Sequence, residues 1–228
     1  MEQLHHLNNV TRPHQGQPVL AAGSPLKQAK AVMIMLHGRG ASAEDILSLT
    51  SELHQPGFTY LAPQAADYSW YPNSFLAPLA SNEPSLTSAL AVIASLLTQI
   101  ADAGIKPERT ILLGFSQGAC LALEFAARNA RRYGGVVGLS GGLIGPDGAP
   151  RNYLGSFDGT PMFLGCSDKD FHIPKERVEY SAQVLQRMGG QVTAHLYPNM
   201  GHTINQDEIH VVQAMMAAMW EKEKGRDS

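Results

Sequence analysis

Cysteine is scarce in this sequence, with only Cys120 and Cys166 among 228 residues. Each lies in an apolar stretch, where a free thiol behaves as a small hydrophobic side chain. Two cysteines do not form a disulfide framework, so we expect a reducing compartment. Residues 1–17 are polar and contain no apolar run typical of a secretory signal. The expected location is therefore the cytoplasm.

An excess of positive charge is also missing. Seventeen Lys and Arg stand against twenty Asp and Glu, and the basic residues are scattered along the chain. Binding to nucleic acid or to an anionic membrane surface depends on clustered basic residues. We also see no apolar run long enough to cross a bilayer. The sequence predicts no nucleic-acid partner and no stable membrane association.

Short apolar runs alternate with longer stretches of helical periodicity from Ala31 onward. The runs typical of buried strands are Ala31–Leu36, Phe58–Ala62, Thr110–Gly114, Gly135–Leu139, Pro161–Gly165 and Gln191–Tyr197. The helical stretches are Ala43–Leu53, Ser85–Ala103, Gly118–Ala130, Lys175–Met188 and Gln206–Lys222. This alternation predicts an α/β fold with a mostly parallel sheet flanked by helices.

We expect one domain over residues 1–228, because the chain shows neither a linker nor an internal repeat. Residues 1–17 are interpreted as a polar N-terminal segment and residues 221–228 as a frayed tail. The apolar face of residues 214–220 is expected to be core, although a homodimer contact is left open. Residues 64–83 and 141–159 do not fit the alternation and are predicted to be long loops, which are often functional.

A nucleophile elbow is the most informative motif. Residues 114–118 read G-F-S-Q-G, a match to G-x-S-x-G, between a predicted strand and an apolar predicted helix. We expect Ser116 to sit in a strained turn, with Gly114 and Gly118 present because a side chain would strike neighbouring backbone. The sequence therefore predicts Ser116 as a nucleophile exposed above the sheet.

A general base and an acid follow the nucleophile at the positions that the strands predict. His202 comes after the last predicted strand, and a loop histidine there can reach the elbow. Asp168 and Asp170 both follow the preceding strand and compete as the acid that orients the histidine. The chain order Ser, Asp, His is the order found in α/β-hydrolases. His195 is interpreted as a structural residue.

A second loop supplies candidate oxyanion donors. Residues 36–40 read L-H-G-R-G after the first strong strand, and in this fold that loop offers a backbone N–H to the oxyanion. We expect the N–H groups of Arg39 and Gln117 to be the two donors. His37 is interpreted as a structural hydrogen-bonding residue beneath the loop. The Arg39 side chain is either a plain surface charge or a contact for an anionic substrate.

Together these motifs resemble the phospholipase/carboxylesterase family, small α/β-hydrolases without a large cap domain that include acyl-protein thioesterases and bacterial carboxylesterases. The resemblance rests on residues 36–40, 114–118, 170–174 and 200–202. Asp170, with Pro174 four residues later, matches the family's acid motif, whereas Phe171 departs from it. The resemblance therefore places Asp170 before Asp168 as the acid.

The resemblance implies hydrolysis of esters or thioesters of short to medium acyl length, with a small-molecule ester as substrate and no metal or organic cofactor. It also implies that Trp70, Tyr71 and Phe75 line an apolar acyl or aryl pocket. A Cys-dependent dienelactone hydrolase, a peptidase and a lidded lipase fit the sequence less well. A non-catalytic binding module is the alternative from another class, since a fold does not determine function. A metal site at Asp168, Asp170 and His172 is a further, weaker alternative.

Overall fold

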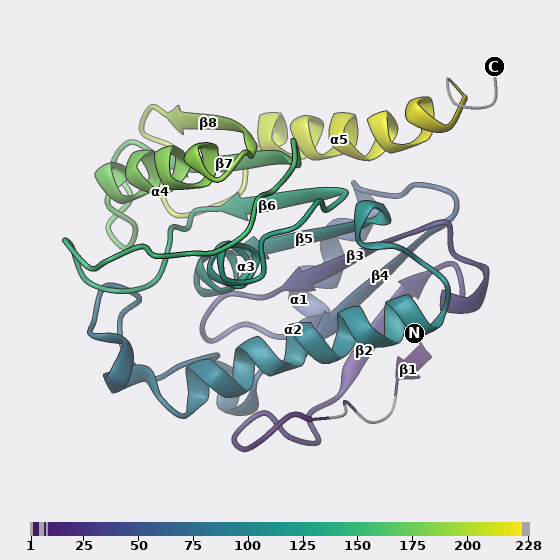
Figure 1. Cartoon of the computed structure of the whole chain (residues 1–228), viewed down its shortest axis with the longest axis horizontal. Helices are drawn as coiled ribbons and strands as arrows, with labels where there is room; N and C mark the ends of the chain where they lie inside the picture. Colours follow the sequence, from purple (N-terminus) through teal and green to yellow (C-terminus); the bar gives the residue numbers. More distant parts are fainter. Residues whose placement is uncertain (1, 5–6, 8, 225–228) are drawn as a thin grey trace.

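The computed structural model describes residues 2–4, 7 and 9–224 (Figure 1). Its centre is an eight-stranded sheet in the order β1-β2-β4-β3-β5-β6-β7-β8. Strands β3 to β8 run parallel, and β1 and β2 add an antiparallel edge beside β4. The strands are β1 (Glu2–Leu4), β2 (Val19–Gly23), β3 (Ala31–Leu36), β4 (Phe58–Pro63), β5 (Thr110–Phe115), β6 (Gly135–Leu139), β7 (Pro161–Ser167) and β8 (Gln191–Tyr197).

Helices cover both faces of this sheet. They are α1 (Ala43–Leu47), α2 (Ser85–Asp102), α3 (Gln117–Arg128), α4 (Lys175–Arg187) and α5 (Gln206–Lys224). Short 3₁₀ turns occupy Leu26–Gln28, Ser48–Ser51, Ala66–Tyr68, Leu79–Asn82 and Pro107–Arg109. Figure 1 shows α2 and α3 in front of the sheet and the fainter α1 behind it. The mostly parallel sheet with flanking helices confirms the predicted fold class.

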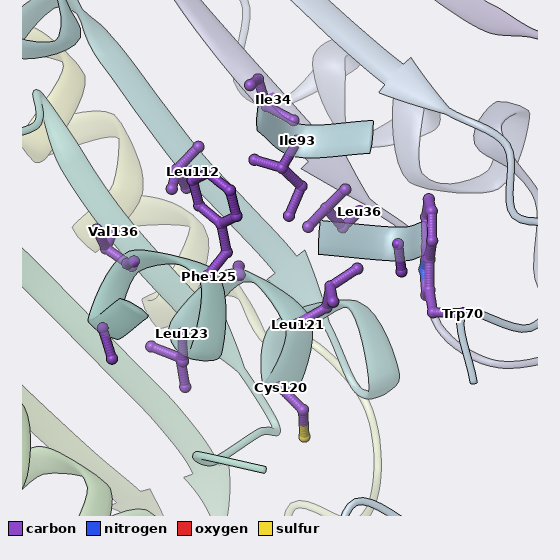
Figure 2. Close-up of a cluster of buried hydrophobic side chains, with 14 of the residues drawn as sticks. Ile34, Leu36, Trp70, Ile93, Leu112, Cys120, Leu121, Leu123, Phe125 and Val136 are labelled. Carbon is purple, nitrogen blue, oxygen red and sulfur yellow. The ribbon is translucent and has the colours of Figure 1, made fainter. Parts of the chain in front are cut away.

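Alternate residues of the central strands enter two separate hydrophobic cores. Ile34 and Leu36 of β3 pack with α2, α3 and α4 on one face, whereas Met33 and Met35 pack with α1 and α5 on the other. Figure 2 shows Ile34 and Leu36 facing residues of α2 and α3 on the first face. Both faces are covered, which explains why the strands read as continuous apolar runs and not as alternating ones.

Helix α2 qualifies as a membrane span by length and composition, which differs from our expectation that no such run exists. The window Ser85–Asp102 has a mean hydropathy of 1.4. Its buried residues, including Leu86, Val92 and Ile93, pack in the core with α3 and the sheet. In this fold α2 is therefore the apolar core helix of an α/β domain.

The N-terminal edge contains two strands that the sequence analysis did not list, since its strands began at Ala31. Strand β2 pairs antiparallel with β4, and β1, within the expected polar segment 1–17, pairs with β2. The β2 sequence, V-L-A-A-G, has one β-branched residue and gives a weak strand signal. Helix α5 continues to Lys224, so residues 221–224 belong to it, and the rest of the expected tail lies outside the described residues.

Candidate active site

The elbow brings Ser116 out of the sheet through steric limits on the backbone around it. Ser116 has φ 54° and ψ −118°, a strained conformation for a residue with a side chain. A Cβ on Gly114 would lie 2.2 Å from the Gly118 carbonyl oxygen, and one on Gly118 would lie 2.1 Å from the Leu36 carbonyl oxygen. Both positions therefore require glycine, as the motif predicts.

A chain of hydrogen bonds joins three elements of the sheet at their carboxyl ends. Ser116 Oγ lies 2.9 Å from His202 Nε2, and His202 Nδ1 lies 2.6 Å from Asp170 Oδ2. Ser116 follows β5, Asp170 follows β7, and His202 follows β8. Parallel strands place their carboxyl ends at one edge, so residues 86 positions apart in sequence meet there.

The Asp170 carboxylate is held as an acceptor in a buried position. Its side chain is 0% exposed, and Oδ1 accepts from the backbone N–H groups of His172 (2.8 Å) and Ile173 (3.1 Å). Burial alone would raise the pKa of Asp170, but these bonds and the neighbouring His202 keep it below its ordinary value. An ionised Asp170 accepts from Nδ1–H, which leaves the Nε2 lone pair directed toward Ser116.

Asp168 lies in a different environment from Asp170. Its Oδ1 accepts from the backbone N–H of Asn199 at 2.8 Å, and its own N–H donates to the Tyr197 carbonyl at 3.0 Å. These bonds close the loops that follow β7 and β8. In the structure Asp170 therefore contacts His202, whereas Asp168 bonds to the backbone of the loops that follow β7 and β8.

Two aromatic rings flank the His202 imidazole. The Phe115 ring centroid is 5.1 Å from it, and the exposed His172 ring meets it edge-on at 4.9 Å. The His202 side chain is 22% exposed, so solvent reaches it while these neighbours limit its rotation. His195, interpreted as structural, lies on β8 and forms its contacts with Tyr197 and Asp207, apart from this chain of bonds.

The two backbone N–H groups expected to face the oxyanion belong to Gln117, the first residue of α3, and to Arg39, in the loop after β3. Both residues line the same cavity as Ser116. First-turn N–H groups of a helix lack an intrahelical partner and carry the positive end of the helix dipole. Beneath this loop His37 Nδ1 donates to the Gly38 carbonyl at 2.8 Å, and Nε2 accepts from Ala65 N–H at 3.0 Å. The structural interpretation of His37 is confirmed.

The segment we call the pocket loop, residues 64–83, lies across the elbow. Tyr71 and Phe75 line a cavity of about 490 Å³, and Ser116 and His202 lie in the same lining. Further lining residues are Arg39, Pro72, Asn73, Ser74, Gln117, Cys120, His172 and Ile173. A larger cavity of about 790 Å³ lies at the amino ends of the strands, and its lining contains neither Ser116 nor His202. The smaller cavity is therefore the candidate active site, because it contains the serine and the histidine that the larger cavity lacks.

Trp70 differs from the expectation that it lines the pocket. It is 0% exposed, and its indole N–H donates to the His37 carbonyl at 2.9 Å. The rings of His14 and His37 lie 5.4 and 5.0 Å from it. Its place in the apolar core is visible in Figure 2. Trp70 is therefore a support beneath the pocket loop, because an indole this deep has no cavity surface.

Two further side chains hold the pocket loop in ways that the sequence did not indicate. The Arg39 guanidinium, expected either as a plain surface charge or as a substrate contact, donates to the carbonyls of Tyr71, Pro72 and Asn73. His14, in the expected polar segment, is 0% exposed, with Nδ1 accepting from Ala66 N–H at 3.0 Å and Nε2 3.0 Å from the Trp70 carbonyl. A single histidine in a polar segment gives no sequence signal of such a long-range contact.

No group of three or more His, Cys, Asp or Glu in the described residues is arranged to hold a metal ion. Cys120 and Cys166 are free and buried, and burial raises the pKa of each thiol to about 12. Such thiols stay protonated near neutral pH and are poor nucleophiles. The groups in this site suited to covalent chemistry are therefore the hydroxyl of Ser116 and the imidazole of His202.

Known proteins resemble the chain over nearly its whole length. The sequence profile of the family described as Phospholipase/Carboxylesterase matches residues 18–220. A crystal structure of a phospholipase/carboxylesterase from Dyadobacter fermentans is 43% identical with a TM-score of 0.86, covering 92% of this chain and 100% of that one. Acyl-protein thioesterase 1 of Emericella nidulans is 28% identical over 88% of this chain and 95% of its own length.

The same enzyme of Gibberella zeae is 33% identical in an alignment that spans 54% of this chain and 53% of that protein. The profile match covers far more than half of the chain, and the sheet order and elbow agree with it. The chain therefore belongs to the phospholipase/carboxylesterase family and is a serine hydrolase of the carboxylesterase/thioesterase type.

Proposed function

We propose that this enzyme hydrolyses carboxylic esters of short to medium acyl length, with Ser116 as nucleophile, His202 as general base and Asp170 as the orienting acid. The observation that carries the proposal is the continuous chain of hydrogen bonds from Ser116 through His202 to Asp170. The cavity beside Ser116 supplies space for the acyl group. The lowered pKa of Asp170 supports its assignment as an ionised partner of the imidazole.

Acylation starts when Ser116 Oγ attacks the ester carbonyl and its proton moves to His202 Nε2. Asp170 accepts from Nδ1–H throughout and stabilises the imidazolium that forms. The tetrahedral oxyanion accepts from the N–H groups of Arg39 and Gln117, each worth about 3 kcal/mol of transition-state stabilisation. His202 then protonates the departing alcohol.

Deacylation repeats the same proton transfers with water. His202 Nε2 removes a proton from a water molecule, which attacks the acyl carbon, and the carboxylic acid leaves as Ser116 regains its proton. Because the base acts as neutral imidazole, we expect the highest rates at neutral to mildly alkaline pH.

Hydrolysis of p-nitrophenyl esters from acetate to decanoate tests the proposal. We expect turnover that peaks at one chain length and falls at least about 10⁴-fold in Ser116→Ala, as nucleophile removal does in serine hydrolases. Ser51→Ala is the control, since Ser51 is an exposed serine outside the cavity lining. Folded wild-type protein without turnover of any ester would favour the non-catalytic binding module. Wild-type rates in Ser116→Ala would refute the assignment of the nucleophile.

A thioester is the second candidate substrate, because the relatives from Emericella nidulans and Gibberella zeae are named acyl-protein thioesterases. The same triad serves either leaving group. Octanoyl thioester and p-nitrophenyl octanoate should be compared on one enzyme preparation, with free thiol detected in the first case.

The cytoplasmic location and the absence of a stable membrane partner stay predictions, which fractionation of cells expressing the tagged full chain would check.

A further inference from the structure

The Arg39 guanidinium binds three successive carbonyl oxygens of the pocket loop. Nη2 donates to Tyr71 (2.9 Å) and Asn73 (2.7 Å), and Nη1 donates to Pro72 (2.7 Å). The guanidinium carbon also lies 6.0 Å from the Tyr71 ring centroid. A planar guanidinium donates in fixed directions, unlike an ammonium group. These contacts therefore fix the orientation of backbone 71–73 as well as its distance from Arg39.

Gln117 holds the inner side of the same segment. Its Oε1 accepts from Trp70 N–H at 2.8 Å, and its Nε2 donates to the Tyr71 carbonyl at 2.8 Å. The residue is 6% exposed, so water does not compete freely for these bonds. The Tyr71 carbonyl consequently accepts from the side chains of Arg39 and Gln117, which approach the pocket loop from different elements. It also accepts from Ser69 Oγ, within the pocket loop itself, at 2.9 Å.

These two residues are also the ones whose backbone N–H groups we assign to the oxyanion. Their backbones would place the substrate carbonyl, and their side chains place Tyr71 at the cavity wall. The other end of the wall is fixed separately, because Gly145 N–H donates to the Phe75 carbonyl at 2.7 Å. Arg39 and Gln117 are therefore the two residues that connect the Tyr71 side of the wall to the elements carrying the assigned oxyanion donors.

We propose that the side chains of Arg39 and Gln117 determine acyl-chain specificity by fixing the pocket wall relative to the oxyanion donors. This inference rests on the proposed ester hydrolysis at Ser116. It assigns Arg39 a positioning function toward the acyl pocket and not the binding of an anionic substrate. With the side-chain contacts removed, Tyr71 and its neighbours are free to shift, and esters of different length are discriminated less sharply.

The test compares kcat/KM across the p-nitrophenyl ester series in wild type, Arg39→Met, Arg39→Lys and Gln117→Met. We expect the ratio between the best ester and the decanoate to change at least about fivefold in both Met variants, a size typical of altered pocket contacts. Arg39→Lys should resemble Arg39→Met, since a single ammonium does not reproduce three directed bonds. Arg187→Ala, at an exposed arginine of α4, is the control and should keep the ratio.

A parallel reaction of each variant with short- and long-chain alkyl fluorophosphonates, followed by mass spectrometry of the Ser116 peptide, separates the possible failures. If wild type is neither labelled at Ser116 nor active on esters, the proposed function fails. If wild type is labelled and active but the variants lose rate equally for every chain length, only the specificity inference is overturned. Thermal unfolding of each variant shows whether it is folded. Any variant that does not fold is set aside, and the folded variants test the specificity inference.

Discussion

The catalytic residues and the pocket loop occupy the same edge of the sheet but are fixed in different ways. Ser116 is placed by backbone sterics: a Cβ on Gly114 would strike the Gly118 carbonyl within the elbow, and a Cβ on Gly118 would strike the Leu36 carbonyl of β3. The pocket loop is placed by polar side chains from distant parts of the chain: His14, His37, Arg39 and Gln117. Backbone collisions that only glycine avoids leave a recognisable motif in the sequence, whereas hydrogen bonds between residues distant in sequence do not.

This difference implies different responses to substitution. A substitution in the catalytic residues removes a chemical step, and one in the elbow glycines disrupts the backbone conformation. Both should cause a large loss of activity or stability. A change in the supports of the pocket loop leaves the chemistry in place and alters stability or selectivity by smaller amounts. Four substitutions test the comparison.

Asp170→Asn should give the largest effect. The amide does not accept in the same way from His202 Nδ1–H, so the imidazole is no longer held in the productive tautomer, and kcat should fall about 10³- to 10⁴-fold. Asp168→Asn is the matched control, because Asp168 bonds to Asn199 N–H and not to His202. Steady-state kinetics on the preferred ester measures both. Equal losses in the two variants would contradict the assignment of the acid.

Gly118→Ala should cost the most stability. The added Cβ would lie 2.1 Å from the Leu36 carbonyl oxygen, and backbone on both sides leaves little room for adjustment. We expect a loss of about 3 kcal/mol or more in the free energy of unfolding. Gly104→Ala is the comparison: its Cβ meets nothing within 4 Å and its φ is +84°, so it should cost only about 1 kcal/mol. Urea denaturation of both variants separates collision from backbone strain.

Much of the fold and of the catalytic chain could be predicted because each element carries a local signal. The apolar runs of β3, β6 and β8 coincide with the observed strands, and the elbow glycines stand where the collisions require them. Strand β2 was missed because its pairing with β4 spans about forty residues of sequence and only one of its five residues, Val19, is β-branched. Trp70 was misplaced because the bond to the His37 carbonyl is a property of the folded chain.

His14→Phe tests the pocket-loop side of the comparison. Phenylalanine keeps an aromatic ring against Trp70 but removes the acceptor for Ala66 N–H and the partner of the Trp70 carbonyl. Two buried polar groups without partners should lower the free energy of unfolding by about 2–4 kcal/mol. Turnover of the preferred ester should fall far less than in Asp170→Asn. His54→Phe, at an exposed histidine, should change neither quantity.

The same variant should alter the acid response. Burial lowers the pKa of His14, so the folded state favours the neutral imidazole. The stability that depends on this neutral form is complete above the ordinary value of 6.5 and is lost as pH falls below it. Unfolding followed between pH 7.5 and 5 should show a smaller decline for His14→Phe than for wild type. Parallel curves would mean that His14 does not contribute to the acid response.

Glu208→Gln should give the smallest effect, and it should raise the free energy of unfolding where His14→Phe lowers it. Glu208 is 0% exposed; its Oε2 accepts from Asn205 N–H at 2.9 Å, and Asn205 Oδ1 accepts from Glu208 N–H at 2.9 Å. Burial raises its pKa to about 7, so the folded state holds this proton more tightly than the unfolded chain. Stability from this group is complete below about 4.5 and is lost as pH rises through 7.

The glutamine keeps the acceptor for Asn205 and carries no charge, so it should be more stable than wild type by about 1–2 kcal/mol at pH 8 and similar to it at pH 5. Glu44→Gln, on the exposed first turn of α1, is the matched control for the loss of a carboxylate at the surface. Glu208 lies on the first turn of α5, six residues after His202, and its buried bonds with Asn205 hold the start of that helix. A gain in stability at pH 8 with kcat maintained would show that residue 208 acts through its hydrogen bond to Asn205 and that its charge is not required. A loss of kcat in the same variant would mean that the catalytic residues depend on the charge of Glu208. It would contradict the view that backbone sterics alone position them.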